Sequence, residues 1–123
     1  MDLLPTFAGL AGADLPSDRV LDGMDIWPVL SGQEEKSPHE AFFYHSQNNL
    51  QAVRSGNWKL HVSDGEAVSL YNLGNDIGES INILEENPDI VNRLLELIAE
   101  FEKDLEQNSR PAAFVDNPVP LTK

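Results

Sequence analysis

The sequence contains no cysteine, which excludes disulfide bonds, thiolate-bound metal ions and a cysteine-derived nucleophile within this chain. It also has no apolar run near the ~18 residues that a membrane-spanning helix needs. An acid follows Met1 where a signal peptide has basic residues, so we expect no signal peptide. Basic residues are scarce, with 8 Lys and Arg against 21 Asp and Glu, and the net charge is −13. This charge repels polyanions, so we expect no binding to nucleic acid or to anionic membranes.

The length and composition are those of one globular domain, with 123 residues of which 41% are hydrophobic and 24% are charged. The charge is unevenly distributed, because residues 76–106 hold ten acids whereas residues 41–63 hold none. The latter segment carries instead four basic or titratable side chains, His45, Arg54, Lys59 and His61. This pattern indicates either an anion-binding surface or only the low acid content of short strands.

The first forty residues predict little regular structure. Apolar residues at spacings of three and four predict a short amphipathic helix over residues 2–12, with Asp2 as its cap and Gly12 at its end. Residues 13–40 are rich in turn-forming and polar residues, which predicts loops. One helical turn is expected within residues 24–30.

From residue 41 the chain predicts an antiparallel meander. Short runs of β-branched, aromatic and apolar residues alternate with turn signals. The predicted strands span residues 41–45, 50–54, 58–62 and 68–73. The first of them, AFFYH, is expected to be buried because of its aromatic content.

A two-residue turn at Gly56-Asn57 fixes the pairing of the central hairpin. It places Arg54 opposite Lys59 on one face of the sheet, together with His61. The other face collects the apolar side chains Val53, Trp58, Leu60 and Val62. Like charges opposite each other destabilise a strand pair unless a negative group lies near them. The basic face therefore predicts either a clamp for a carboxylate, phosphate or sulfate, or neutralisation by acids from the loops.

A long helix is predicted to follow the sheet. Asn87 is a capping residue, Pro88 suits the first helical position, and the chain then has a helical apolar stripe. The stripe consists of Val91, Leu94, Leu95, Ile98, Phe101 and Leu105. We expect it to cover the apolar face of the sheet. The predicted fold class is therefore α+β, with a small antiparallel sheet of three to four strands, one long C-terminal helix and a helical or irregular N-terminal lead-in.

No complete active site can be built from these residues. His39, Glu40 and His45 do not have the spacing of a compact metal-ligand set, and surface histidines are the simpler interpretation. The sequence contains no glycine-rich phosphate loop and no recognisable Ser-His-Asp arrangement. We expect neither a catalytic residue nor a metal ligand in this chain.

The order of several short motifs resembles the C-terminal portion of the arylsulfatase-type sulfatases, which belong to the alkaline-phosphatase-like superfamily. The motifs are DLLPT (2–6), LAG (10–12), LDGMDIWPVLSG (21–32), FFYH (42–45), LQAVRSGNWKLH (50–61) and LYNL (70–73), followed by Asp76, Glu79 and Asn82. The most specific part is AVRSGNWKLH joined to LYNL. The sequence departs from the family pattern at Asn72, where aspartate is usual, and at Ile77, where Asp-Pro is usual.

The resemblance implies a division of the chain. Residues 1–40 are a lead-in from the end of a missing catalytic domain, residues 41–107 are the C-terminal sulfatase subdomain, and residues 108–123 are an extended tail. The family hydrolyses sulfuric esters with a formylglycine nucleophile, made from a Cys/Ser-x-Pro-x-Arg motif, and with calcium. Both are expected in the full-length parent, and neither is expected in this chain. The resemblance thus implies a sulfatase fragment that forms part of the substrate-pocket wall and is not catalytic alone.

The resemblance also supplies candidate substrate-binding residues. His61 matches a family position near the sulfate pocket, Lys59 and Arg54 belong to the same motif, and His45 is a candidate for the pocket rim. The substrate, a sulfate ester, is expected to bind only together with the catalytic domain. The alternatives are a stand-alone anion-binding or protein-interaction module derived from a sulfatase, and self-association through an exposed interdomain surface. The family is commonly exported, periplasmic or lysosomal, which leaves the compartment of this protein unknown.

Overall fold

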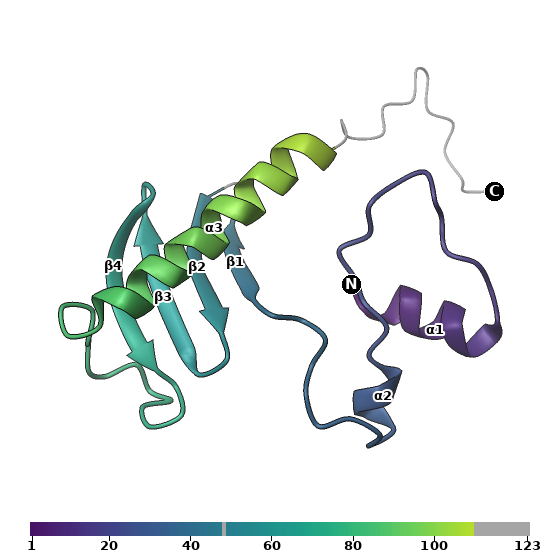
Figure 1. Ribbon diagram of the computed structural model, residues 1–123, viewed down its shortest axis with the longest axis horizontal. Helices are drawn as coiled ribbons and strands as arrows, with labels where there is room; N and C mark the ends of the chain where they lie inside the picture. Colours follow the sequence, from purple (N-terminus) through teal and green to yellow (C-terminus); the bar gives the residue numbers. More distant parts are fainter. Residues whose placement is uncertain (48, 110–123) are drawn as a thin grey trace, which may run out of the picture.

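The computed structural model describes residues 1–47 and 49–109. It forms a lead-in, residues 1–40, and a sheet–helix unit, residues 41–109 (Figure 1). The elements are α1 (Leu3–Ala11), α2 (Trp27–Leu30), β1 (Phe42–Ser46), β2 (Asn49–Ser55), β3 (Trp58–Ser63), β4 (Glu66–Asn72) and α3 (Pro88–Asn108). The predicted extended tail lies, from residue 110 onward, outside the described residues. In the described part of the chain, no helix is both long and apolar enough to cross a membrane.

The four strands form one antiparallel sheet in the order β1-β2-β3-β4, which confirms the predicted meander and the α+β class. Arg54 pairs with Lys59 and Val53 pairs with Leu60, as the turn at Gly56-Asn57 predicts. Gly56 has a φ of 57°, a left-handed conformation that a residue with a side chain adopts only with strain. The sequence of this turn therefore sets which side chains share a face.

The helix α3 lies across one face of the sheet (Figure 1). The core consists of Val53, Leu60, Val62 and Leu70 from the strands and Val91, Leu94 and Ile98 from α3. Phe101 extends this contact to the edge strand β1, because its ring stacks on that of Phe43 with centroids 4.0 Å apart. The predicted packing of the helical stripe on the sheet is confirmed for Val91, Leu94 and Ile98, whereas Leu95 is only half-buried and Leu105, at the end of the predicted stripe, is exposed.

The prediction that β1 is a buried strand is wrong. β1 is an edge strand, and both Phe42 and Tyr44 are 42% exposed. Phe43, which lies between them, points towards α3 and is half-buried, whereas His45, two residues further along, contacts α3 but is exposed. The alternation of a strand places neighbouring side chains on opposite faces, so Phe42 and Tyr44 lie on the face away from α3, where the Phe42 ring meets that of His39 with centroids 5.2 Å apart.

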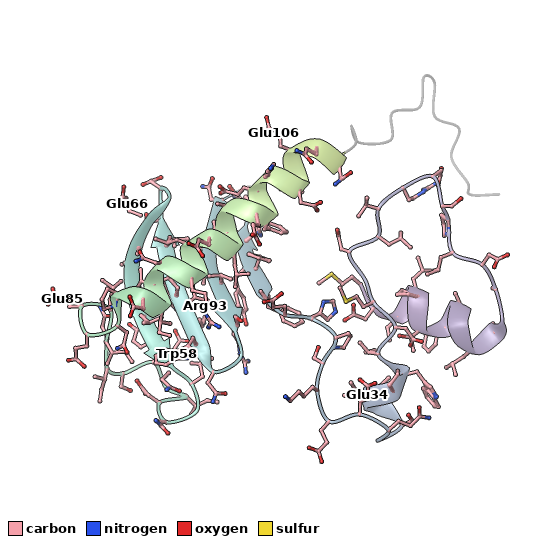
Figure 2. The ribbon with its side chains drawn as sticks, viewed as in Figure 1. Glu34, Trp58, Glu66, Glu85, Arg93 and Glu106 are labelled. Atoms are coloured by element: carbon pink, nitrogen blue, oxygen red, sulfur yellow. The ribbon has the colours of Figure 1, made fainter. Side chains whose placement is uncertain are left out.

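The helix α3 begins as predicted at Pro88, with Asp89 in its first turn. The expected side-chain cap is wrong, because Asn87 makes no capping hydrogen bond and its Nδ2 donates instead to the carbonyl of Ile83 at 2.9 Å. Acidic side chains project from the outer side of α3, including Glu106 near its end (Figure 2). The acidic run of the sequence is thus a solvated helix face.

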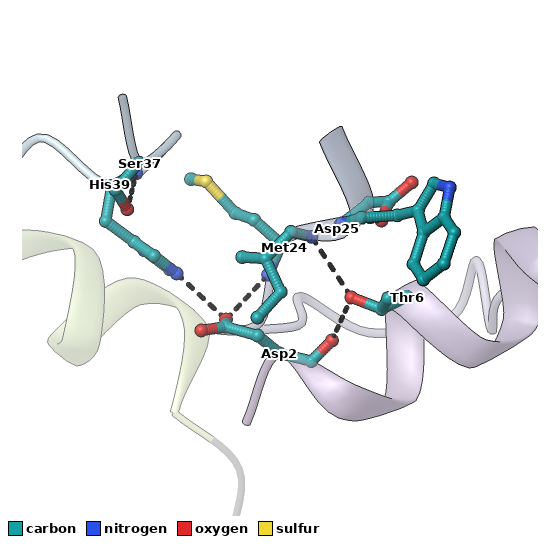
Figure 3. Close-up of polar contacts among 8 residues, drawn as sticks. Asp2, Thr6, Met24, Asp25, Ser37 and His39 are labelled. Carbon is teal, nitrogen blue, oxygen red and sulfur yellow. Dashed lines mark hydrogen bonds and ion pairs between the residues drawn. The ribbon is translucent and has the colours of Figure 1, made fainter. Parts of the chain in front are cut away.

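A polar network holds the lead-in together (Figure 3). The Asp2 carboxylate accepts hydrogen bonds from the backbone N–H of Met24 at 3.0 Å and contacts His39 Nε2 at 2.8 Å. Thr6 Oγ1 donates to the Asp2 carbonyl and accepts from the N–H of Ile26. Asp2 stands at the N-cap position of α1 as predicted, but its side chain makes no capping hydrogen bond, and Gly12 ends the helix in the left-handed conformation.

The lead-in leaves many large apolar side chains exposed. On α1 these are Leu3, Leu4, Phe7 and Leu10, each more than half exposed. Trp27 of α2 is also exposed. Self-association through this surface stays a prediction.

We expect Leu94→Ala to lower the free energy of unfolding by about 2–5 kcal/mol, because it leaves a cavity at a fully buried position between α3 and the sheet. Leu105→Ala on the same helix is the matched control, since Leu105 is 49% exposed and its loss is expected to cost under ~0.5 kcal/mol. Urea unfolding of the two variants measures both values. Equal losses would place the buried side of α3 elsewhere.

Candidate functional site

The open face, defined here as the sheet face opposite α3, carries a three-residue polar cluster. Lys59 Nζ lies 2.6 Å from Glu79 Oε1, and His61 Nε2 lies 2.7 Å from Glu79 Oε2. Lys59 and His61 are two residues apart on β3, so the strand alternation presents both on this face. Glu79 comes from the loop between β4 and α3. One carboxylate therefore binds two of the three basic-face side chains that were expected to bind an anion.

Arg54 lies on the same face through its pairing with Lys59 but does not join the cluster. It is exposed, and its Nε donates to the carbonyl of Gly56 at 3.2 Å. Of the two interpretations of the like-charge pair, neutralisation by a loop acid therefore applies to Lys59. Arg54 keeps its charge available on the open face, because no ion pair to it is found among residues 1–47 and 49–109.

Two tyrosines complete the open face. The Lys59 ammonium lies 5.1 Å from the ring centroid of Tyr44, within the range of a cation–π interaction. The Tyr71 ring meets the His61 ring edge-on, with centroids 5.7 Å apart. These contacts restrict the positions of two side chains of β3: Tyr44, from β1 two strands away, contacts Lys59, and Tyr71, from the neighbouring strand β4, contacts His61.

His45 is not brought together with the other candidate residues. The β-bulge between Tyr44 and His45 shifts the register of β1. The His45 ring lies 5.7 Å from that of Phe101 on α3, which is the opposite side of the sheet from Lys59. The structure thus separates His45 from Arg54, Lys59 and His61.

The loop that carries Glu79 is held by its own side chains. Asp76 accepts hydrogen bonds from the N–H groups of Ser80 and Ile81 at 2.8 and 2.9 Å. Asn82 Oδ1 accepts from the N–H groups of Leu70 and Leu84, which joins the loop to β4. Glu79 was not among the predicted site residues. The one signal for it in the sequence was that Asp76, Glu79 and Asn82 follow the LYNL motif in the order that resembles the sulfatase family.

A cleft of about 580 Å³ opens elsewhere, between α3 and the ends of β2 and β3. Its lining includes Leu50, Asp64, Leu95 and Glu102, and it contains none of the candidate residues. The described residues also contain no group of three or more His, Cys, Asp or Glu side chains placed to hold a metal ion. The candidate site is therefore the cluster on the open face.

Comparisons with known proteins give the family. No protein-family model matches the chain. Over 110 residues the chain is 36% identical to arylsulfatase A of Homo sapiens, an alignment that covers 68% of this chain and 22% of that protein. It is 31% identical to arylsulfatase A of Bos taurus in an alignment of 128 residues with its gaps, which covers 83% of this chain and 25% of that protein. It is 51% identical to the steryl-sulfatase of Mus musculus over 63 residues, which cover 48% of this chain and 10% of that protein.

The chain belongs to the arylsulfatase-type sulfatases. It matches the C-terminal part of these proteins and spans a quarter or less of their length. Solved structures agree: one from Bacteroides thetaiotaomicron, described in connection with glycosaminoglycan metabolism, has a TM-score of 0.70 and 27% identity over 83% of this chain and 24% of that one. A second, described as a 2-O GAG sulfatase, has a TM-score of 0.56 and 29% identity, and the match covers 86% of this chain and 24% of that one.

The ion pairs of Glu79 predict a pH dependence. The hydrogen bond from Lys59 is the largest cause that lowers the pKa of Glu79, and His61 adds to it, while partial burial opposes the shift. Because the pKa of this carboxyl group is lower in the folded state, its ion pairs stabilise the folded state at pH values above the unfolded-state pKa of about 4.5. This stabilisation is lost as the pH falls through the lower folded-state pKa. We expect Glu79→Gln to unfold more easily than the unmodified chain near neutral pH, with the difference shrinking below ~pH 4. Urea unfolding across this range measures it, and a difference that grows on acidification would contradict the ion pairs.

Proposed function

We propose that this chain forms part of the wall of the substrate pocket in a sulfatase, and that the open face of the sheet is this wall. The observation that carries the proposal is the gathering of Arg54, Lys59 and His61 on the sheet face opposite α3. This is a concentration of basic groups in a chain of net charge −13. Basic groups aimed at one place bind an anionic ester group and stabilise charge that develops on it. His45 is left out of the wall because it lies beside Phe101.

The proposed activity of the whole protein is the hydrolysis of sulfuric esters. The family implies calcium and a formylglycine in its full-length members. The described residues do not provide a metal-ligand group, and the sequence has no cysteine and no Ser-x-Pro-x-Arg motif. The residues present therefore do not fit either group, and no step of the reaction is assigned to this chain. Its contribution is to bind and orient the sulfate ester at the pocket wall, in the presence of a catalytic domain.

We expect this polypeptide alone to show no sulfatase activity, because its sequence has no cysteine and no Ser-x-Pro-x-Arg motif to supply the nucleophile, and residues 1–47 and 49–109 contain no metal-ligand group. The assay uses the purified chain with a chromogenic aryl sulfate and calcium. Turnover at the level of buffer is expected. A calcium-dependent rate that survives repurification would overturn the assignment of this chain to a non-catalytic wall.

We also expect the open face to bind sulfate weakly, with a Kd of about 1 mM or higher, since the rest of the pocket is missing. Backbone amide NMR shifts during a sulfate titration measure it, with chloride at matched ionic strength as the control. Shifts confined to residues 52–62 and to the Glu79 loop, and lost in Lys59→Ala, would support the wall. Equal responses to sulfate and chloride would contradict it.

The same titration addresses the alternative function, a stand-alone anion-binding module. The exposed Arg54 is the observation that favours this alternative. Such a module needs no second domain, so it predicts a Kd in the micromolar range. If Arg54→Ala lost this tight binding, the sulfate site would be located on the open face.

A further inference from the structure

We propose that Glu79 is a built-in counter-anion, a positioning residue that occupies the donors of Lys59 and His61 and thereby limits the affinity of the open face for free sulfate. This inference rests on the proposed function of that face as a pocket wall. It assigns a role to an acid that neither the charge pattern nor the like-charge pair had singled out.

The geometry of the carboxylate is the first argument. Its two oxygens bind two different partners, at 2.6 Å from Lys59 Nζ and 2.7 Å from His61 Nε2. A sulfate group that approaches the same donors carries oxygens of the same kind and the same sign of charge. Sulfate and the Glu79 carboxylate therefore compete for Lys59 and His61, because like charges cannot share one small site without a large cost.

The placement of Glu79 is the second argument. Its φ is 52°, a left-handed conformation that is uncommon and strained for a residue with a side chain. The loop is held in this shape on both sides, by Asp76 through the N–H groups of Ser80 and Ile81, and by Asn82 through that of Leu70. A freely moving loop would not hold a carboxylate against β3. The loop instead fixes it there at a high local concentration.

The charge of the open face is the third argument. The negative charge of Glu79 offsets the positive charge of Lys59, whereas Arg54 lies outside this ion pair and donates to the carbonyl of Gly56. The consequence for a pocket wall is that Lys59 and His61 are held in fixed positions without binding free sulfate tightly. Sulfate is the product of ester hydrolysis, so weak binding of the free ion favours its release.

The test compares sulfate binding by the unmodified chain and by Glu79→Gln, which keeps the size of the side chain and removes its charge. We expect Glu79→Gln to bind sulfate at least tenfold more tightly, as measured by amide NMR shifts at constant ionic strength. The double variant Glu79→Gln with Lys59→Ala should lose this gain. The matched control is Glu66→Gln, which removes the same charge from an exposed position on β4 and should leave the affinity within about twofold.

A merely structural role for Glu79 predicts a different result, because loss of a structural ion pair disturbs the face and weakens or does not change sulfate binding. Equal or weaker binding by a folded Glu79→Gln would overturn the counter-anion. If neither chain bound sulfate, the pocket wall itself would be contradicted as well. Glu79→Ser provides a second neutral variant if Glu79→Gln fails to fold, and the same gain in affinity is expected from it.

Discussion

The burial of one sheet face under α3 is the interaction on which the rest of the structure depends. Side chains alternate along each strand, so Val53, Leu60 and Leu70 can reach α3 only if their neighbours point the other way. Those neighbours are Arg54, Lys59, His61 and Tyr71. A shift of the register by one residue would bury the basic side chains and expose the core. The hydrophobic core and the polar cluster are therefore set by the same pairing.

Much of this arrangement can be predicted because it depends on local sequence. The turn at Gly56-Asn57 sets the register of β2 and β3, and the helical spacing of Val91, Leu94 and Ile98 gives the buried side of α3. Asn87 and Asp2 were mispredicted as helix caps for a shared reason. The Asn87 side chain turns back to Ile83, and the Asp2 carboxylate binds Met24, 22 residues further along the chain. The capping propensity of a residue type predicts which residues can cap a helix. It does not predict the other hydrogen-bond partners that the fold brings close to the same side chain.

The role of Glu79 could not be predicted from the pairing of the strands. It lies 20 residues after Lys59, in a loop whose shape depends on its own left-handed conformation and on the hydrogen bonds of Asp76. The strand pairing predicts the conflict between the like charges of Arg54 and Lys59, but it does not predict which group neutralises them. The structure resolves it for Lys59 with an internal carboxylate. This result changes the open face from a simple cationic clamp into a nearly neutralised surface with Arg54 at one side, which suits a pocket wall that binds an ester together with another domain.

The division of the sheet into a covered face and an open face is the central claim, and hydroxyl-radical footprinting of the full chain tests it most directly. Three consecutive aromatic residues of β1, Phe42, Phe43 and Tyr44, report on the two faces. We expect rapid oxidation of Phe42 and Tyr44 and slow oxidation of Phe43, because Phe43 stacks on Phe101 of α3. Equal protection of all three in a monomeric sample, or faster oxidation of Phe43, would contradict it.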